Sequence, residues 1–583
     1  MVHHVRAGIT LGKMSVLLGG LLIGMLLLGC YEPAVNLVVS PPSEVIQVAQ
    51  ATGSKQSSAP ARSGPPGSNA PSSKTQSSKT PGTKSTAPTP PASSPPSAST
   101  KKSNQPATTN ATATAAAAAA DAAPVRLPLF TGWEKPALAI VISGRQNGYI
   151  EPCGCAGLTN QKGGMARRHS LIRQLEERGW PVLPVDVGNQ VKRFGRQSEI
   201  KFQIAYEALK KMGYQAIGLG PDDLRLSSGE LFSSITDEPS RFVSANVAVL
   251  DRDATPRFRV IEQSGWKIGV TAVLSEELRG KVQGEEVSSE AVEKGLQVAA
   301  AALAKSGCDL QVLLVSGSLN ETRAIAKRFP QFRLVVTTGG GEEPEMEPEV
   351  VAGTNNWIVQ VGGKGMFAGV VGIWKDARRT MKYQRVPLDD RFPDSPEMLA
   401  LLEAYQDQLE TAGLEELVRP LAHPSGSTFV GTAACADCHT SAMAVWKDSP
   451  HAHATDSLVH PQERGTIPRH HDPECLSCHV TGWDPQRFVP FKSGYASLKK
   501  TPELQQSGCE NCHGPGSAHV AAEQGTTKVS DQQRKQLRLS MQLPLAKARQ
   551  RCLECHDMDN SPNFHKDGAF EKYWERVAHP GKD

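Results

Sequence analysis

Cys435-Ala436-Asp437-Cys438-His439 is the first of four copies of the pattern Cys-x-x-Cys-His in the last third of the chain. In chain order the second to fourth motifs are Cys475-Leu476-Ser477-Cys478-His479, Cys509-Glu510-Asn511-Cys512-His513 and Cys552-Leu553-Glu554-Cys555-His556. Attachment of a c-type haem requires this spacing, because two thiols bond to the vinyl groups of one porphyrin and the adjacent imidazole lies under the iron. The motifs therefore predict four covalently bound c-type haems, with His439, His479, His513 and His556 as the proximal iron ligands.

Zinc is the other metal that such cysteine pairs bind. A structural zinc site does not require a histidine directly after every second cysteine, whereas all four motifs have one. We therefore favour haem and keep zinc as the alternative.

The N-terminus has the features of an export signal. Arg6 and Lys13 precede an apolar run at residues 15–28, which is too short for an ordinary transmembrane helix. The run ends in Leu27-Leu28-Gly29-Cys30, which resembles the bacterial lipobox. This resemblance implies a signal peptide at residues 1–29, lipidation of Cys30, and an anchor on the periplasmic side of the outer membrane or at the cell surface. An ordinary signal peptide with an incidental cysteine is the alternative.

The next segment has the composition of a linker. Residues 51–124 consist mostly of Ser, Thr, Pro, Ala and Lys and lack the large apolar residues that form a core. We expect residues 30–124 to form a disordered tether that holds the following domains away from the membrane. The net charge of +4 gives no indication of nucleic acid as a partner.

Residues 425–583, the haem region below, hold twelve of the sixteen histidines of the chain. Large apolar residues are sparse there, so we expect a mainly helical domain in which the haems supply much of the core. The histidines that follow no cysteine pair are candidates for the second axial position on the irons. These candidates are His451, His453, His460, His470, His471, His519, His565 and His579.

Four segments of the haem region resemble the cytochrome c-554 family of tetrahaem electron carriers. They are the first motif with Trp446-Lys447-Asp448-Ser449-Pro450-His451-Ala452, the second with Val480-Thr481-Gly482, the third with Gly514-Pro515-Gly516-Ser517-Ala518-His519, and Tyr573-Trp574 with His579-Pro580 after the fourth.

This resemblance implies electron transfer between redox proteins and mostly bis-histidine haems, with one five-coordinate iron. By position, His451, His519 and His579 match the distal ligands, and the second motif matches the haem with an open face. His453, two residues after His451, is a competing ligand. An open iron leaves a second hypothesis, an oxidoreductase acting on a small nitrogen or sulfur compound.

Residues 125–422, the middle region below, alternate buried-strand and helical patterns, which predicts an α/β domain with mostly parallel strands. The expected strands are 137–143, 182–187, 216–219, 242–246, 267–274, 310–315 and 334–336, and the expected helices are 164–178, 198–212, 290–305 and 320–329. Strands at 357–361 and 366–374 look like a closing hairpin.

The middle region also resembles the catalytic domain of calcineurin-like metallophosphoesterases, particularly 5′-nucleotidases. The matching segments are Val185-Asp186-Val187-Gly188-Asn189, Gly218-Leu219-Gly220-Pro221-Asp222-Asp223-Leu224, Ser244-Ala245-Asn246-Val247, Leu314-Val315-Ser316-Gly317 and Thr338-Gly339-Gly340-Gly341.

The metal ligands of that family are mostly missing. A two-metal site needs several His and carboxylate ligands, yet the middle region contains a single histidine, His169, in an expected helix. Asp186 remains in place, and Asp222 and Asp223 are weak substitutes. We therefore expect the dinuclear site to be absent, and a divergent phosphoesterase is only a second alternative.

Cys153-Gly154-Cys155 follows the first expected strand. Two thiols at this spacing could bind a soft metal or a small-molecule ligand together with Asp186, could form a redox centre, or could be inert. A disulfide between residues two apart would be strained. These three alternatives remain open at this point.

Overall fold

The computed structural model describes residues 126–153, 160–235, 240–282, 284, 286–375, 381–462 and 465–581. The predicted signal peptide, Cys30, the tether at 30–124 and Cys155 lie outside these residues. None of the helices in the described ranges is long and apolar enough to cross a bilayer.

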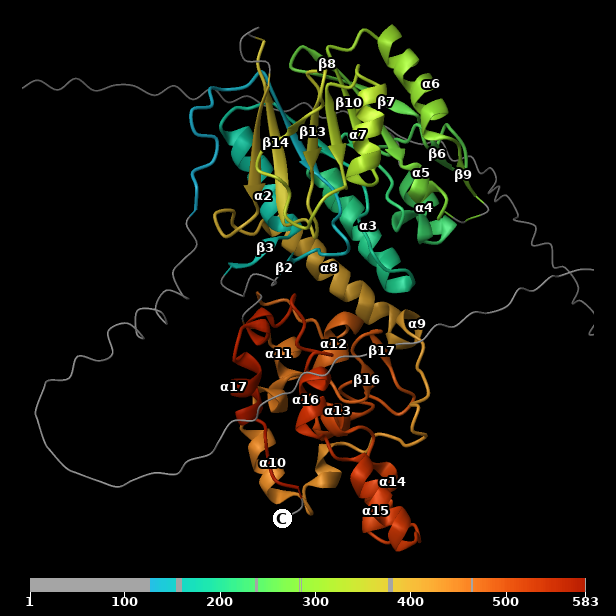
Figure 1. Cartoon of the computed structure of the whole chain (residues 1–583), viewed down its shortest axis with the longest axis vertical. Helices are drawn as coiled ribbons and strands as arrows, with labels where there is room; N and C mark the ends of the chain where they lie inside the picture. Colours follow the sequence, from blue (N-terminus) through green and yellow to red (C-terminus); the bar gives the residue numbers. More distant parts are fainter. Residues whose placement is uncertain are drawn as a thin grey trace, which may run out of the picture. The chain divides into compact units, whose positions relative to one another are not determined.

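The middle region contains two large mixed sheets (Figure 1). The first has the order β15-β14-β1-β4-β5, formed by Met381–Pro387, Phe367–Ile373, Leu138–Ser143, Val182–Asp186 and Ala216–Ile217. The second has the order β12-β13-β11-β10-β8-β7, formed by Glu349–Val350, Trp357–Gln360, Leu334–Thr337, Leu310–Ser316, Trp266–Leu274 and Phe258–Gln263. Two small pairs, β2 with β3 and β6 with β9, are formed by Pro152–Cys153, Lys162–Gly163, Val247–Val249 and Val287–Ser289.

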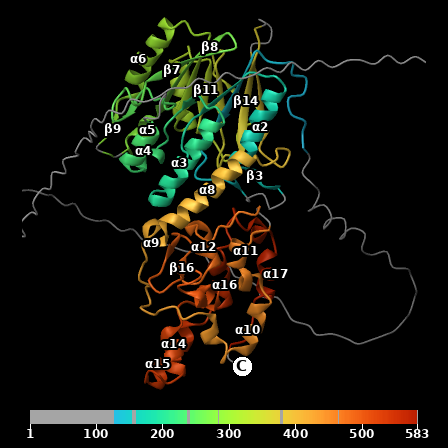
Figure 2. The same ribbon diagram turned by 180° about the vertical axis from the view of Figure 1, so that it is seen from behind.

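Alternation along the strands explains how these sheets are layered. In β1, Leu138, Ile140 and Ile142 belong to the apolar cluster shared by the two sheets, whereas Ala139 and Val141 face the helices. The helices on that side are α2 (Met165–Glu177), α3 (Arg196–Lys211) and α8 (Pro396–Ala412) (Figure 2). Those packed on the second sheet are α6 (Val292–Lys305) and α7 (Leu319–Arg328) (Figure 1). Both faces of each central strand are therefore buried, which is why these strands are continuously apolar.

The predicted α/β sandwich is confirmed, and its central pairs, β1 with β4 and β8 with β10 and β11, are parallel. The predicted hairpin is wrong, because β13 pairs with β11 of the second sheet and β14 pairs with β1 of the first. The link between them crosses from one sheet to the other at Gly362, where φ is +75° and a Cβ would lie 2.7 Å from the Glu342 carbonyl oxygen. The strand expected at 242–246 is also wrong, since only Phe242 forms a bridge and the strand begins at Val247.

The haem region consists mainly of short helices. They are α10 (Thr440–Lys447), α11 (Asp456–Val459), α12 (Pro473–His479), α13 (Cys509–His513), α14 (Ser517–Glu523), α15 (Asp531–Ser540), α16 (Leu545–Cys552) and α17 (Ala569–Glu575). Its buried apolar cluster contains only Leu458, Leu476, Val480, Trp483, Tyr495 and Leu504. The small size of this cluster agrees with the expectation that haem supplies much of the core. The remaining helices are α4 (Ser228–Ile235) and α5 (Glu276–Arg279) in the middle region and α9 (Leu414–Leu417) before the haem region.

Candidate haem sites

Each Cys-x-x-Cys-His motif closes a helical turn. The second and third motifs lie in α12 and α13. In the first and fourth, the backbone N–H of the histidine donates to the carbonyl of the first cysteine, at 3.1 Å for His439 and 2.9 Å for His556. Residues three and four apart lie on one face of a helical turn, so the local fold places both thiols and the imidazole on the same side. This arrangement fits attachment of one porphyrin.

Second partners orient three of the four proximal imidazoles. Nδ1 of His479 donates to the Ala454 carbonyl at 2.7 Å, and Nδ1 of His513 donates to the Met541 carbonyl at 2.6 Å. Nδ1 of His556 lies 2.8 Å from Ser561 Oγ. A histidine that binds a metal through one ring nitrogen usually donates the other N–H in this way. The side chains thus leave Nε2 as the nitrogen available to iron, and they fit the haem that the motifs imply.

The three predicted distal histidines each face a different proximal histidine. Two imidazoles on opposite sides of one iron hold their ring centroids about 6 Å apart, because each metal–nitrogen bond is about 2 Å long. The observed pairs are His439 with His519 at 6.4 Å, His451 with His556 at 6.1 Å, and His513 with His579 at 5.8 Å. In this geometry His519 faces the histidine of the first motif, His579 that of the third and His451 that of the fourth, and their role as distal ligands stays a prediction. It uses all three predicted distal ligands, and the open face at the second motif remains a prediction.

His453 does not compete with His451 in this geometry. Its side chain is 71% exposed and lies 3.6 Å from Asp456, whereas the His451 ring faces His556. Burial lowers the pKa of His451, which favours the neutral form that binds iron. Nε2 of His565 donates to the His556 carbonyl at 2.8 Å, so it is engaged elsewhere.

The contacts between cysteine thiols of different motifs show which motifs are neighbours in space. The thiol of Cys435 lies beside that of Cys509, joining the first motif to the third. Cys512 lies near Cys552, and Cys555 lies beside Cys478. The order of attachment sites is therefore first, third, fourth, second, which the chain order does not reveal.

Asp186 has a structural role in the first sheet of the middle region. Its buried carboxylate accepts hydrogen bonds from Ser143 Oγ at 2.5 Å, Gly188 N at 2.7 Å and Gln190 Nε2 at 2.7 Å. The guanidinium of Arg168, with no exposed surface, lies 3.9 Å away and supplies the neighbouring positive charge. Burial raises the pKa of Asp186 and the Arg168 charge opposes that rise. Hydrogen-bond donors and one fixed cation surround the buried Asp186 carboxylate, and its predicted role as a metal or substrate ligand stays a prediction.

Asp223 is also structural. Its carboxylate accepts backbone hydrogen bonds from Asn189, Gln190 and Gly220 at 2.7, 2.7 and 2.9 Å. Within the described ranges, no group of three or more His, Cys, Asp or Glu residues could hold a metal ion. A phosphoesterase mechanism therefore has no ligand set among these residues.

Cys153 lies beside Asp559 of the haem region. Its buried Sγ is 3.6 Å from Oδ1 of Asp559, which is three residues beyond His556. Asp559 also accepts hydrogen bonds from the Tyr149 hydroxyl and from Lys364 Nζ. The site predicted from Cys153, Cys155 and Asp186 stays a prediction, because Cys155 lies outside the described residues. Nothing in the sequence pattern around Asp559 marked it as the partner of these three residues.

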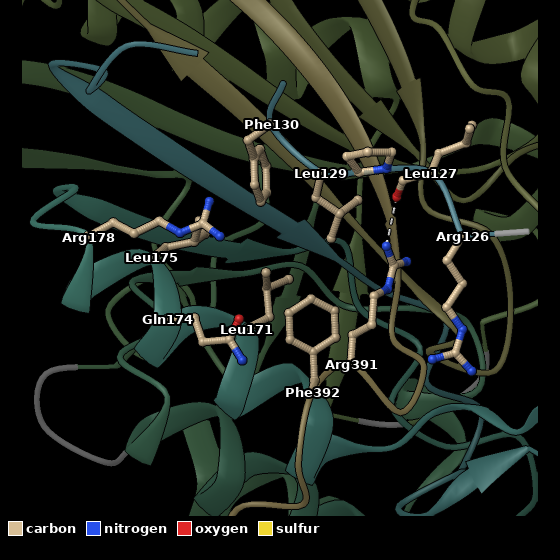
Figure 3. Close-up of a pocket in the computed structure, with 11 residues that line it drawn as sticks. Arg126, Leu127, Leu129, Phe130, Leu171, Gln174, Leu175, Arg178, Arg391 and Phe392 are labelled. Atoms are coloured by element: carbon tan, nitrogen blue, oxygen red, sulfur yellow. Dashed lines mark hydrogen bonds between the residues drawn. The ribbon is translucent and has the colours of Figure 1, made fainter. Parts of the chain in front are cut away.

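One apolar cavity of about 270 Å³ lies where residues 126–130 pack against α2 (Figure 3). Leu129, Phe130, Leu171 and Phe392 line it. Two of its arginines are engaged, since Arg126 pairs with Asp390, and NH1 of Arg391 donates to the Leu127 carbonyl at 2.8 Å. The cavity belongs to the packing of this segment onto the sandwich.

Comparison with known proteins finds a family model and a curated relative that match part of the haem region. Residues 434–514 match the family model described as cytochrome c554 and c-prime. The cytochrome c-554 of Nitrosomonas europaea is 31% identical over 121 residues, which are 18% of this chain and 47% of that protein. The chain thus spans about half the length of this curated relative. The haem region carries the sequence of a c-type cytochrome, a class that binds haem covalently.

The middle region is similar to solved phosphoesterases at low identity. A 5′-nucleotidase precursor from Thermus thermophilus is 20% identical with a TM-score of 0.42, covering 55% of this chain and 66% of that one. A calcineurin-like phosphoesterase from Bacillus subtilis is 14% identical with a TM-score of 0.38, covering 46% of this chain and 97% of that one. These proteins belong to the class that the sequence of the middle region resembles.

Proposed function

We propose that this protein is an exported, lipid-anchored tetrahaem c-type cytochrome that transfers electrons between redox proteins outside the cytoplasm. When bound, each haem iron carries one electron by alternating between its ferric and ferrous states. The export signal, the lipobox-like Leu27-Leu28-Gly29-Cys30 and the four motifs support the compartment and the number of haems.

The observation that carries the proposal is the pairing of three proximal with three distal histidines at 5.8 to 6.4 Å. Two axial histidines saturate an iron and give it a lower potential than histidine with methionine does. These histidine pairs would hold haems that supply electron exchange and leave no iron position for a substrate. The order of the motifs in space supports a path from the first through the third and fourth to the second.

The same pairing of histidines favours a second candidate function, that of an oxidoreductase. The three distal ligands matched by the family resemblance all serve the first, third and fourth irons, so that resemblance assigns an open face to the second. An oxidoreductase acting there on a small nitrogen or sulfur compound is the second candidate, with the other three haems removing or supplying electrons.

The test is to purify the full-length protein and count haem by its alkaline pyridine absorbance per chain. We expect four haems per chain and a mixed spectrum, mostly low spin with one high-spin iron that shifts on addition of nitric oxide. Fewer than four haems would contradict the tetrahaem proposal. A wholly low-spin spectrum would remove the second candidate and leave the electron carrier.

A further inference from the structure

We propose that the middle region sets the reduction potential of the haem attached at Cys475 and Cys478, through the buried ammonium group of Lys201. This inference rests on the proposed electron-transfer function and adds a role for the α/β domain. It makes that domain a functional part of the second haem site.

The central contact joins α3 to the helix that carries the second motif. Lys201 is 8% exposed, and its Nζ lies 2.8 Å from Oε2 of Glu474. Arg193 pairs with the other oxygen of the same carboxylate. Glu474 lies in the first turn of α12 and directly precedes Cys475. One middle-region helix thus delivers a buried cation to the carboxylate that directly precedes Cys475, a residue that would bond to the porphyrin.

A second set of contacts holds the beginning of α12. Asp472 caps this helix by accepting from the backbone N–H of Glu474 at 2.8 Å. Its other partners come from the middle region, since Gln197 Nε2 donates at 2.8 Å and the Tyr405 hydroxyl at 3.1 Å. Gln197 belongs to α3 and Tyr405 to α8. Because Lys201 and Asp472 are buried and hydrogen-bonded to the network, Lys201 has a fixed position relative to the second motif.

The charges around the second motif show how Lys201 contributes to the local charge balance. Lys201 and Arg193 oppose Glu474 and Asp472, and the Arg469 side chain pairs with Glu151 of the middle region. Burial disfavours the charged ammonium, but Glu474 and Asp472 outweigh this and raise the pKa of Lys201, so it is positive at neutral pH. Removing Lys201 therefore leaves an excess negative charge at the start of α12, the helix that would carry the second haem.

A fixed positive charge near a haem favours the form that has gained an electron. At a separation on the order of 10 Å and an effective dielectric constant of about 20, loss of one charge changes the equilibrium constant for reduction about tenfold. The haems of the first and third motifs belong to the other end of the series and should respond much less, because the interaction falls with distance.

The experiment is a redox titration of the full-length protein with visible spectra recorded at each potential. Lys201→Met should make reduction of one haem about tenfold less favourable and leave the other three nearly unchanged. Glu474→Gln, which is nearly isosteric, should move the same haem in the opposite direction. The double variant should return close to the wild-type value. Lys211→Met is the matched control, because Lys211 is an exposed lysine at the end of the same helix.

Opposite shifts of one haem in the two single variants support the inference. No shift in either variant, or equal shifts of all haems, would overturn it. If Lys201→Met does not fold, Glu474→Gln and Arg193→Gln still test the inference, because they should move the reduction potential of the same haem in opposite directions. Haem content is counted separately, so failure of the tetrahaem proposal appears as a wrong count and not as a missing shift.

Discussion

Lys364 and Asp559 form an ion pair with Nζ 2.5 Å from Oδ1, joining the link after β13 to the segment that follows the fourth haem motif. The side chains are 20% and 24% exposed. The same carboxylate accepts the Tyr149 hydroxyl and lies beside the Cys153 thiol. Asp559 of the haem region therefore contacts three residues of the middle region.

Replacing Asp559 by alanine should lower the free energy of unfolding by about 1–3 kcal/mol, because Lys364 and Tyr149 lose their shared partner in a poorly solvated place. Thermal unfolding of the haem-loaded protein measures this loss. Asp567→Ala, an exposed aspartate nearby, is the control and should leave the midpoint unchanged.

The Asp559 contribution should also depend on pH in a definite direction. Burial opposes ionisation of Asp559, but Lys364 and Tyr149 outweigh it and hold the pKa below its usual value. A carboxyl group with a lowered pKa in the folded state stabilises fully above its unfolded pKa of about 3.9, and that stability is lost as pH falls through the folded pKa. The difference between wild type and Asp559→Ala should therefore be constant near neutral pH and shrink below about pH 4. A difference that grows on acidification would contradict the ion-pair explanation.

The distal ligand of the fourth haem can be tested with two histidines two residues apart. His451→Ala should convert one low-spin haem to high spin, because the ring facing His556 is lost. His453→Ala, at an exposed side chain, should leave the spectrum unchanged. Electron paramagnetic resonance of the oxidised protein distinguishes the two variants. The reverse result would assign His453 as the ligand.

Asp186 should affect stability and not metal content. Asp186→Ala leaves the buried Arg168 guanidinium without its carboxylate, which costs about 3–5 kcal/mol. A chelator such as EDTA should leave the unfolding temperature of the wild type unchanged. A large fall of that temperature with EDTA would restore a metal role for this carboxylate.

Glu510, inside the third motif, should couple that motif to the start of the first. Its buried carboxylate accepts the backbone N–H groups of Gly431 at 2.8 Å and Gly516 at 2.7 Å, and that of Val430 at 3.0 Å. Glu510→Ala leaves these donors unsatisfied and should cost about 3 kcal/mol or more. Glu503→Ala, at an exposed glutamate, serves as the control in the same unfolding measurement. Equal stability of both variants would show that water replaces the carboxylate.

Much of the middle region could be predicted from local pattern. Residues 138–142 and 312–315 are continuous apolar runs of strand length, so burial on both faces could be predicted from the sequence. The hairpin expected at 357–374 failed because a glycine-rich link permits either a turn within one sheet or a crossing between two. Only the position of β1 and β11, distant in the chain, decides between them.

The sequence by itself determined the haem chemistry, because two thiols and an imidazole at fixed spacing are a local requirement that a single helical turn satisfies. It also singled out His451, His519 and His579 by resemblance. Tertiary structure alone decided which proximal histidine each one faces and the order of the motifs in space. It also decided that Asp186 is held by Arg168 and that Lys201 and Lys364 reach the haem region. These relations join residues up to about 400 positions apart, and they arise from packing and charge pairing that no local pattern encodes.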